Sequence, residues 1–393
     1  LIENPILGAF TALQSVLIMP HFHRFLPSLL SNPEISDPRL ITHTVSTVFA
    51  EQKLGKQKSP VFLTTFFSTA HFPYAAPSPW FAKFQHRNSS QRFLFRKDPD
   101  IEVTTNPNTN TVEISKETKE QTIALYDGAL SAIDEEFKKI FQKLEAKGWL
   151  ENAIILVLGD HGENLYDGKL GMGHGDGVQG EFSTLTPLIF LLTGKAKNNK
   201  SQNTDEIKFV RSIDVAPTVL KRLQLNDQSL AFDGVPLFDH TKVAALFPRD
   251  AGYTESGIWF SSSFVTPEKQ SRIVYPSVTG ILELDPGMNY EFYLNPVFAQ
   301  TIFSVKERTW ISDRYRLITR ATTDGIQISL YDRKLDLFSN QDLLLVSSPK
   351  MLFNYKKIAS SMLKEMNKYL QSRGVEIVKN FEDKFFYSEN VPQ

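Results

Sequence analysis

The sequence predicts an α/β protein with a mainly parallel central sheet flanked by helices, followed by a small C-terminal antiparallel sheet and a helix. The first observation is a long amphipathic helix over residues 117–147, whose apolar side chains recur at helical spacing. The second is the apolar run over 153–159, which follows that helix directly and is typical of a buried parallel strand. The third is a change beyond about residue 245 to short β-type segments, which lead into a helix over 351–370.

Length and composition bound the domain organisation and the class of function. The 393 residues suffice for a main α/β domain over 1–245 and a smaller α+β subdomain over 246–393. The 43 basic and 44 acidic residues give a net charge of −1, so no electrostatic footprint for nucleic acid or an anionic membrane is present. The absence of cysteine excludes disulfides and thiolate metal sites within the chain, although it does not decide the compartment.

The remaining elements follow from apolar spacing and turn residues. Residues 6–19 are too few and too polar for a transmembrane helix and lack the features of a signal peptide, so we interpret them as a helix packed in a core. A polar stretch over 86–118 is a predicted surface excursion. Further predictions, in chain order, are a helix over 40–54, a buried strand over 61–67, a glycine-rich loop over 167–177, a strand over 186–192 and a short helix over 212–220.

The most informative motif is Asp160-His161-Gly162-Glu163, which directly follows the apolar run at 153–159. α/β folds keep their ligand sites at the carboxyl ends of such strands. Gly162 permits a sharp turn, which would let the two preceding side chains converge on one ion. A carboxylate beside an imidazole suits Zn²⁺, Mn²⁺ or Ca²⁺. The alternative is an N-cap aspartate beside a structural histidine.

Three of the eight histidines lie at strand ends or among glycines, namely His71, His161 and His174. His71 follows the predicted strand at 61–67, where it could donate to an anionic oxygen or protonate a leaving group; the alternative is a core histidine bonded to a backbone carbonyl. The glycines around His174 would let its loop fold over the site, or they are simply a flexible loop. Glu163 could orient His161, but we interpret it as a helix cap. The other histidines have no such context, although His21 and His23 would share one face of an extended segment.

In their order along the chain, these motifs resemble the sulfatase branch of the alkaline phosphatase superfamily. The resemblance rests on His71-Phe72-Pro73-Tyr74, on the Asp-His-Gly-Glu and Gly-His-Gly motifs, on a Thr-Pro-Leu-Ile strand, and on Asp214 with Pro217-Thr218. It continues through residues 232–237 to the strand pair at 314–318 and 330–332. It implies an alkaline phosphatase-like fold for the predicted α/β domain.

The resemblance also implies roles for particular residues. Asp160 and His161 would ligate one divalent ion, Ca²⁺ by preference with Mn²⁺ or Zn²⁺ as alternatives. His71 and His174 would contact the anionic ester or its leaving oxygen. Asp214, Tyr315 and Tyr331 match family positions that we interpret as structural. The segment Thr254-Glu255-Ser256-Gly257 resembles one in some bacterial members and receives no chemical role.

Other family features have no counterpart in this sequence. The family nucleophile lies upstream of the His-x-Pro-Tyr strand, as a formylglycine from a Cys/Ser-x-Pro/Ala-x-Arg motif or as a threonine, and the first aspartate ligands also lie upstream. The chain has no cysteine, no such arginine motif and no early aspartate pair. The expectation is therefore that the chain is the C-terminal part of a sulfatase-like protein and is inactive alone. The nucleophile, further ligands and a membrane tether are then expected upstream of Leu1.

Three functions compete at this stage. The first is hydrolysis of sulfate esters, favoured by the C-terminal segments. The second is hydrolysis of phosphonates or phosphodiesters, or transfer of phosphoethanolamine or glycerol phosphate, favoured by Asp-His where many sulfatases have Asp-Asn. The third is a non-catalytic sulfatase-like module. The resemblance implies a small-molecule, glycan-linked or lipid-linked anionic ester as substrate, no nucleic-acid partner, and a periplasmic or membrane-anchored extracytoplasmic location.

Overall fold

The computed structural model describes residues 36–50, 60–85, 103–105, 112–167, 171–175, 177–194, 209–225, 232–237, 250–257, 278–288, 290–322, 325–346, 348–377 and 387–389. The chain divides into two compact units, which are treated separately below. The first comprises residues 1–107, 112–154 and 191–198, and the second comprises 108–111, 155–190 and 199–393. The expected helix at 6–19, together with His21 and His23, lies outside the described residues.

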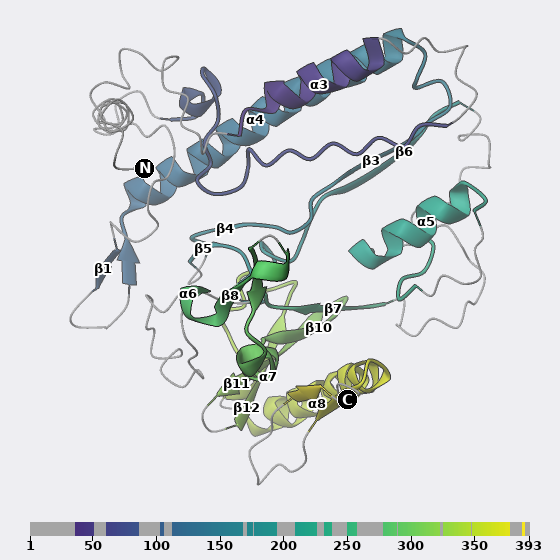
Figure 1. The fold of residues 1–393 in the computed structure, drawn as a ribbon. Coiled ribbons are helices and arrows are strands. Elements are labelled where there is room, and N and C mark those ends of the chain that lie inside the picture. Colours follow the sequence, from purple (N-terminus) through teal and green to yellow (C-terminus); the bar gives the residue numbers. More distant parts are fainter. Residues whose placement is uncertain are drawn as a thin grey trace. The chain divides into compact units, whose positions relative to one another are not determined.

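The first unit is built on the long helix α4 (Lys116–Ala146), which confirms the helix predicted over 117–147 (Figure 1). Ser115 caps it by accepting a hydrogen bond from the Thr118 backbone N–H. The helix α3 (Pro38–Ala50) packs against it through a cluster of Val45, Phe49 and Ile140. The unit also contains the turn η1 (Trp80–Ala82) and the hairpin of β1 (Val103–Thr105) and β2 (Val112–Ile114).

The buried strand predicted over 61–67 is wrong. Residues 60–67 have no regular secondary structure, and Phe62 is 87% exposed. Aromatic and β-branched residues form a strand only where a neighbouring strand supplies hydrogen-bond partners. No such neighbour is present among the described residues.

The apolar run of the sequence forms β3 (Ile154–Leu158), which pairs with β6 (Leu188–Leu192). The Gly159 N–H donates to the Pro187 carbonyl, and the Thr193 N–H donates to the Ala153 carbonyl. The end of β3 thus lies beside the start of β6, and the end of β6 lies beside the start of β3, so the two strands are antiparallel. Both strands were predicted at these positions, whereas no parallel pairing occurs within the described ranges.

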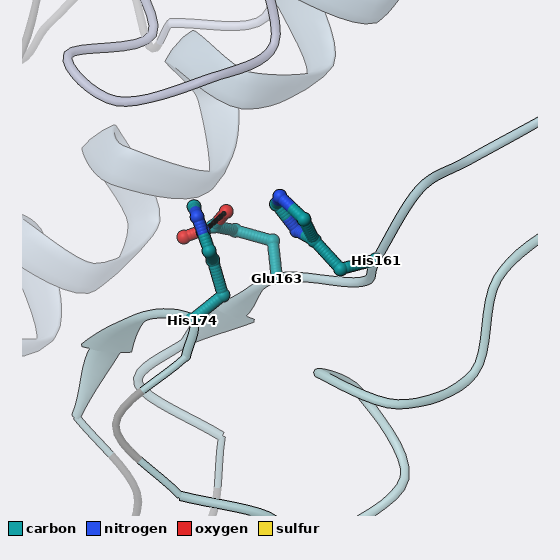
Figure 2. A group of neighbouring side chains, drawn as sticks. All are labelled: His161, Glu163 and His174. Atoms are coloured by element: carbon teal, nitrogen blue, oxygen red, sulfur yellow. Dashed lines mark hydrogen bonds and ion pairs between the residues drawn. The ribbon is translucent and has the colours of Figure 1, made fainter. Parts of the chain in front are cut away.

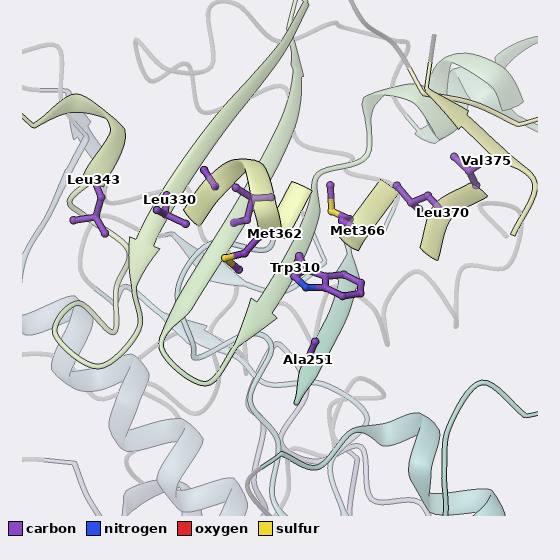
Figure 3. Close-up of a cluster of buried hydrophobic side chains, with 10 residues drawn as sticks. Ala251, Trp310, Leu330, Leu343, Met362, Met366, Leu370 and Val375 are labelled. Atoms are coloured by element: carbon purple, nitrogen blue, oxygen red, sulfur yellow. The ribbon is translucent and has the colours of Figure 1, made fainter. Parts of the chain in front are cut away.

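The C-terminal part of the second unit is the antiparallel sheet and helix that the sequence predicts. Its strands follow the order β12 (Gly325–Asp332), β11 (Tyr315–Thr322), β10 (Arg308–Ser312) and β7 (Ala251–Glu255). The helix α8 (Pro349–Ser372) packs on this sheet, and its apolar side chains form one cluster with those of the strands (Figure 3). The predicted boundary at residue 245 stays a prediction.

Shorter elements complete the second unit. They are β4 (Asn164–Leu165), β5 (Met172–Gly173), η4 (Ser212–Asp214), α5 (Val215–Arg222), α6 (Val278–Ile281), β8 (Leu282–Asp285), η6 (Pro286–Met288), β9 (Glu291–Leu294), α7 (Pro296–Val305), η7 (Leu343–Leu345), β13 (Val375–Ile377) and β14 (Tyr387–Glu389). No helix among the described residues is both long enough and apolar enough to cross a membrane.

The core beneath α8 yields a direct stability prediction. Met366 is fully buried between the helix and the sheet, whereas Phe353 on the same helix is 71% exposed. Met366→Ala is expected to lower the free energy of unfolding by about 2–5 kcal/mol, because the substitution removes buried apolar contacts and leaves a cavity. Phe353→Ala is expected to change it by about 0.5 kcal/mol or less. Urea unfolding followed by fluorescence measures both; equal losses would contradict this packing.

Candidate metal and catalytic site

The candidate site forms where β3 ends and the short hairpin β4–β5 begins. In the hairpin, Asn164 lies opposite Gly173, so the next opposed position brings Glu163 across from His174. Directly opposed residues of antiparallel strands have neighbouring side chains. The hairpin therefore joins the Asp-His-Gly-Glu motif to the Gly-His-Gly motif.

Two histidines and a glutamate converge at this point (Figure 2). The Nδ1 atom of His174 lies 2.8 Å from Oε2 of Glu163 and donates to it, as the acceptor is a carboxylate. The imidazole rings of His161 and His174 stack, with centroids 3.7 Å apart and an interplanar angle of 25°. One ligand-capable atom from each of His161, Glu163 and His174 lies within 4.8 Å of the others, so the three side chains could share a cation.

Asp160 joins this group through His161. The Asp160 Oδ1 atom accepts the His161 backbone N–H at 3.0 Å, and its Oδ2 lies 3.7 Å from His161 Nε2. The His161 Nδ1 atom lies 2.9 Å from the Gly162 carbonyl oxygen and must donate to it, which leaves Nε2 as the basic nitrogen. Two ligands each about 2.1–2.4 Å from one ion lie roughly 3.0–3.9 Å apart, so Asp160 Oδ2 and His161 Nε2 fit a divalent cation.

Gly162 is required for close packing and not for a left-handed turn. The backbone bends at Asp160 and His161, as the sequence predicts, but the φ of Gly162 lies outside the positive region. A Cβ at this position would collide with the Phe182 carbonyl oxygen. The Gly162 N–H donates to the Ser183 carbonyl at 3.0 Å. The motif is thus held against the 182–183 backbone at a distance that only glycine permits.

The prediction that Glu163 caps a helix is wrong, because the residues that follow it form β4 and not a helix. Its carboxylate instead bonds His174, eleven residues along the chain. The sequence predicts only a glycine-rich loop between the two motifs, and it indicates neither the hairpin nor its register. Only that register identifies Glu163 as a member of the site.

His71 lies in the first unit, on the turn that follows residues 60–67. Its Nδ1 atom lies 2.7 Å from the Phe72 carbonyl oxygen, and the residue is exposed. The carbonyl bond matches the alternative considered for His71, whereas the exposure does not match a core histidine. The structure thus brings Asp160, His161 and His174 together and describes His71 within a separate unit, so its catalytic role stays a prediction.

Asp214 is structural, in agreement with its interpretation from sequence. Its carboxylate accepts two hydrogen bonds from the Arg211 guanidinium, at 2.8 and 3.0 Å, and one from the Val235 backbone N–H at 2.9 Å. The Thr218 hydroxyl accepts the Leu237 N–H at 2.9 Å. These bonds hold the 232–237 segment against η4 and α5.

A model of the sulfatase family matches residues 10–225, which is more than half of the chain. The chain belongs to the sulfatase family. The Multifunctional alkaline phosphatase superfamily protein PehA of Trinickia caryophylli is 25% identical over 204 residues, which cover 45% of this chain and 38% of PehA.

Solved structures support the same fold. The putative sulfatase yidJ from Bacteroides fragilis superposes with a TM-score of 0.53 at 14% identity, over 85% of this chain and 58% of that protein. The phosphonate monoester hydrolase of Agrobacterium radiobacter gives a TM-score of 0.53 at 15% identity, over 93% and 67% of the two chains. These neighbours confirm the alkaline phosphatase-like α/β fold class. This sulfatase-family chain spans well under two thirds of PehA and of the Bacteroides fragilis protein.

Proposed function

We propose that this sulfatase-family chain contributes to a metal-dependent hydrolase of sulfate esters. The observation that carries the proposal is the 3.7 Å separation of Asp160 Oδ2 and His161 Nε2, directly beside the bonded pair of Glu163 and His174. A carboxylate and an imidazole at that spacing can hold a cation, and a second imidazole stands next to it.

Asp160 and His161 would hold the ion, Ca²⁺ by preference with Mn²⁺ or Zn²⁺ as alternatives. When bound, such an ion supplies positive charge that neutralises the ester's anionic oxygens. The Gly162 carbonyl keeps His161 in the tautomer that presents Nε2. Glu163 does the same for His174, whose Nε2 would then donate to or receive a proton from a substrate oxygen. His71 is proposed as a second substrate-contacting imidazole.

A phosphorus-centred reaction is the second candidate. Asp-His in place of the Asp-Asn of many sulfatases favours it, and so does the similarity to PehA, an alkaline phosphatase superfamily protein described as multifunctional. The fold neighbour from Agrobacterium radiobacter is a phosphonate monoester hydrolase. Phosphonate, phosphodiester and phosphoethanolamine or glycerol-phosphate chemistry all belong to this candidate, and a non-catalytic module is the remaining outcome.

The experiment uses the full open reading frame that encodes this chain. The purified product is assayed with an aryl sulfate and an aryl phosphonate monoester, before and after removal of divalent ions by chelation. Turnover of the sulfate that disappears on chelation and returns with Ca²⁺, Mn²⁺ or Zn²⁺ is expected. Preference for the phosphonate would favour the second candidate, and no turnover of either would favour a non-catalytic module.

The residue type of the nucleophile, read from the full reading frame, also distinguishes these candidate functions. A Cys/Ser-x-Pro/Ala-x-Arg motif in the reading frame would indicate a sulfatase or its phosphonate relative, and a threonine in its place would indicate a transferase. We also propose that the 393 residues alone turn over either ester weakly, because they include no cysteine and no such motif. An extracytoplasmic location and a glycan-linked or lipid-linked substrate are proposed from the family resemblance.

A further inference from the structure

The loop that carries His174 is hydrogen-bonded to one end of the C-terminal sheet. The Gly257 N–H, just beyond β7, donates to the Gly175 carbonyl at 2.8 Å. The Val178 N–H donates to Oε2 of Glu307, the residue before β10, at 3.1 Å. Both bonds are made by residues within four positions of His174. Their partners follow the end of β7 and precede the start of β10, which lie side by side in the sheet.

Glu307 is itself fixed from several sides. It is only 3% exposed, and its Oε1 accepts the Arg320 Nε–H at 2.8 Å. The Ser256 hydroxyl accepts the Glu307 backbone N–H at 3.0 Å, and the Ser256 N–H donates to the Glu307 carbonyl at 2.9 Å. A buried carboxylate is tolerated only with such partners, so its position is narrowly determined.

The backbone on either side of His174 has little intrinsic preference for one conformation, because glycines flank the residue. Gly173 and Gly175 have φ values of +105° and +87°, in the left-handed region that glycine enters without penalty. Bonds to other segments must therefore decide where the imidazole points. On one side Gly173 pairs with Asn164 of β4, and on the other Gly175 and Val178 bond to Gly257 and Glu307.

We infer that Glu307, supported by Ser256 and Gly257, is a positioning residue for His174. It fixes the backbone after His174, so that Nδ1 meets the Glu163 carboxylate and the ring stacks on His161. This gives Ser256 and Gly257, the last two residues of the Thr254-Glu255-Ser256-Gly257 segment, a role that the sequence did not supply. The consequence for catalysis rests on the proposed hydrolase function, whereas the consequence for the geometry of His174 does not.

Two variants test the inference by different routes. Glu307→Gln keeps the shape of the side chain but removes the charge that faces Arg320. Gly177→Ala leaves Glu307 intact, but its new Cβ would lie 3.0 Å from Glu307 Oε2 and press on the same contact. Glu255→Gln is the matched control, because it neutralises a carboxylate one residue from Ser256. The Glu255 carboxylate accepts hydrogen bonds from Tyr253 and Lys306 and lies 3.7 Å from Arg308, without contacting Glu307 in any of these bonds.

The readouts are hydrogen exchange of the Gly257 amide and the ¹H–¹⁵N signal of the His174 Nδ1–H, without added metal. Both test variants are expected to speed Gly257 exchange about fivefold, as for the loss of one hydrogen bond, and to weaken the Nδ1–H signal. Glu255→Gln is expected to leave both unchanged. In the full-length enzyme, kcat should fall about 10–100-fold in the test variants, with less change in KM.

The outcomes test the positioning role of Glu307 separately from the proposed hydrolase function. Unchanged Gly257 exchange and an unchanged His174 signal in folded Gly177→Ala protein would overturn the positioning role, even if Glu307→Gln fails to fold. Equal changes in the Glu255→Gln control would overturn it as well. If the wild-type enzyme hydrolyses no ester, the proposed function fails, but the exchange and imidazole signals still decide whether Glu307 positions His174.

Discussion

Replacing Glu181 with alanine is expected to lower the free energy of unfolding by about 3–5 kcal/mol, because it leaves a buried arginine without its counter-charge. The Glu181 carboxylate accepts two hydrogen bonds from Arg333, at 2.7 and 2.8 Å. It also lies 3.0 Å from Nη2 of Arg316, whose side chain is fully buried. Urea unfolding of the wild type and the variant measures the difference.

The lowered pKa of Glu181 makes folding stability depend on pH. Burial alone would raise the pKa of Glu181, but the hydrogen bonds and charges of Arg333 and Arg316 outweigh it and hold the pKa below 4.5. A carboxyl group with a lowered folded-state pKa stabilises the fold above its unfolded pKa, and this stabilisation is lost as the pH falls through the folded value. The difference in the free energy of unfolding between wild type and Glu181→Ala should therefore have its largest value at pH 7 and decrease below about pH 4.5.

An exposed ion pair in the same region serves as the control. Lys334 lies 2.6 Å from Asp313, and both side chains are more than half exposed. Lys334→Ala is expected to cost about 0–1 kcal/mol, since water screens the pair in the folded protein. A Glu181→Ala loss no larger than the Lys334→Ala loss would show that the buried arginines find other partners.

The parts of the fold that the sequence predicted are those whose signal is local. Helix α4 and helix α8 appear within two residues of their predicted bounds, because an apolar stripe at helical spacing depends on the helix alone. Strands β3 and β6 are continuous apolar runs and were found in the same way. Residues 61–67 carry an equally strong local signal, yet a strand also needs a neighbour, which a local pattern cannot reveal.

The candidate site was also predictable only where its sequence signals are local. Asp160, His161 and His174 stood out because metal-capable side chains follow a strand or sit among glycines. Glu163 was misread, since its partner depends on which residues of β4 and β5 face each other. Glu307 gave no signal at all, because it meets Val178 from 129 residues away. Contacts between distant segments require the folded structure.

The largest effect on function is expected from Asp160→Ala in the protein expressed from its full reading frame. The substitution removes the anionic oxygen that lies 3.7 Å from His161 Nε2. Loss of a residue that only orients a ligand typically costs 10–100-fold in metal affinity, so loss of a ligating carboxylate should cost more than about 100-fold. Titration calorimetry with Ca²⁺, Mn²⁺ and Zn²⁺ measures this directly, without any assumption about the substrate.

The matched control is Asp313→Ala, which removes an exposed carboxylate from the turn between β10 and β11. It should bind metal with wild-type affinity. Because the Asp160 side chain is 64% exposed, its removal should cost little folding stability, so a weaker affinity cannot be ascribed to unfolding. Wild-type affinity in Asp160→Ala would reject Asp160 as a ligand. Since the ligand-capable atoms of His161, Glu163 and His174 lie within 4.8 Å of one another, that result would instead make these three side chains the next ligands to test by substitution.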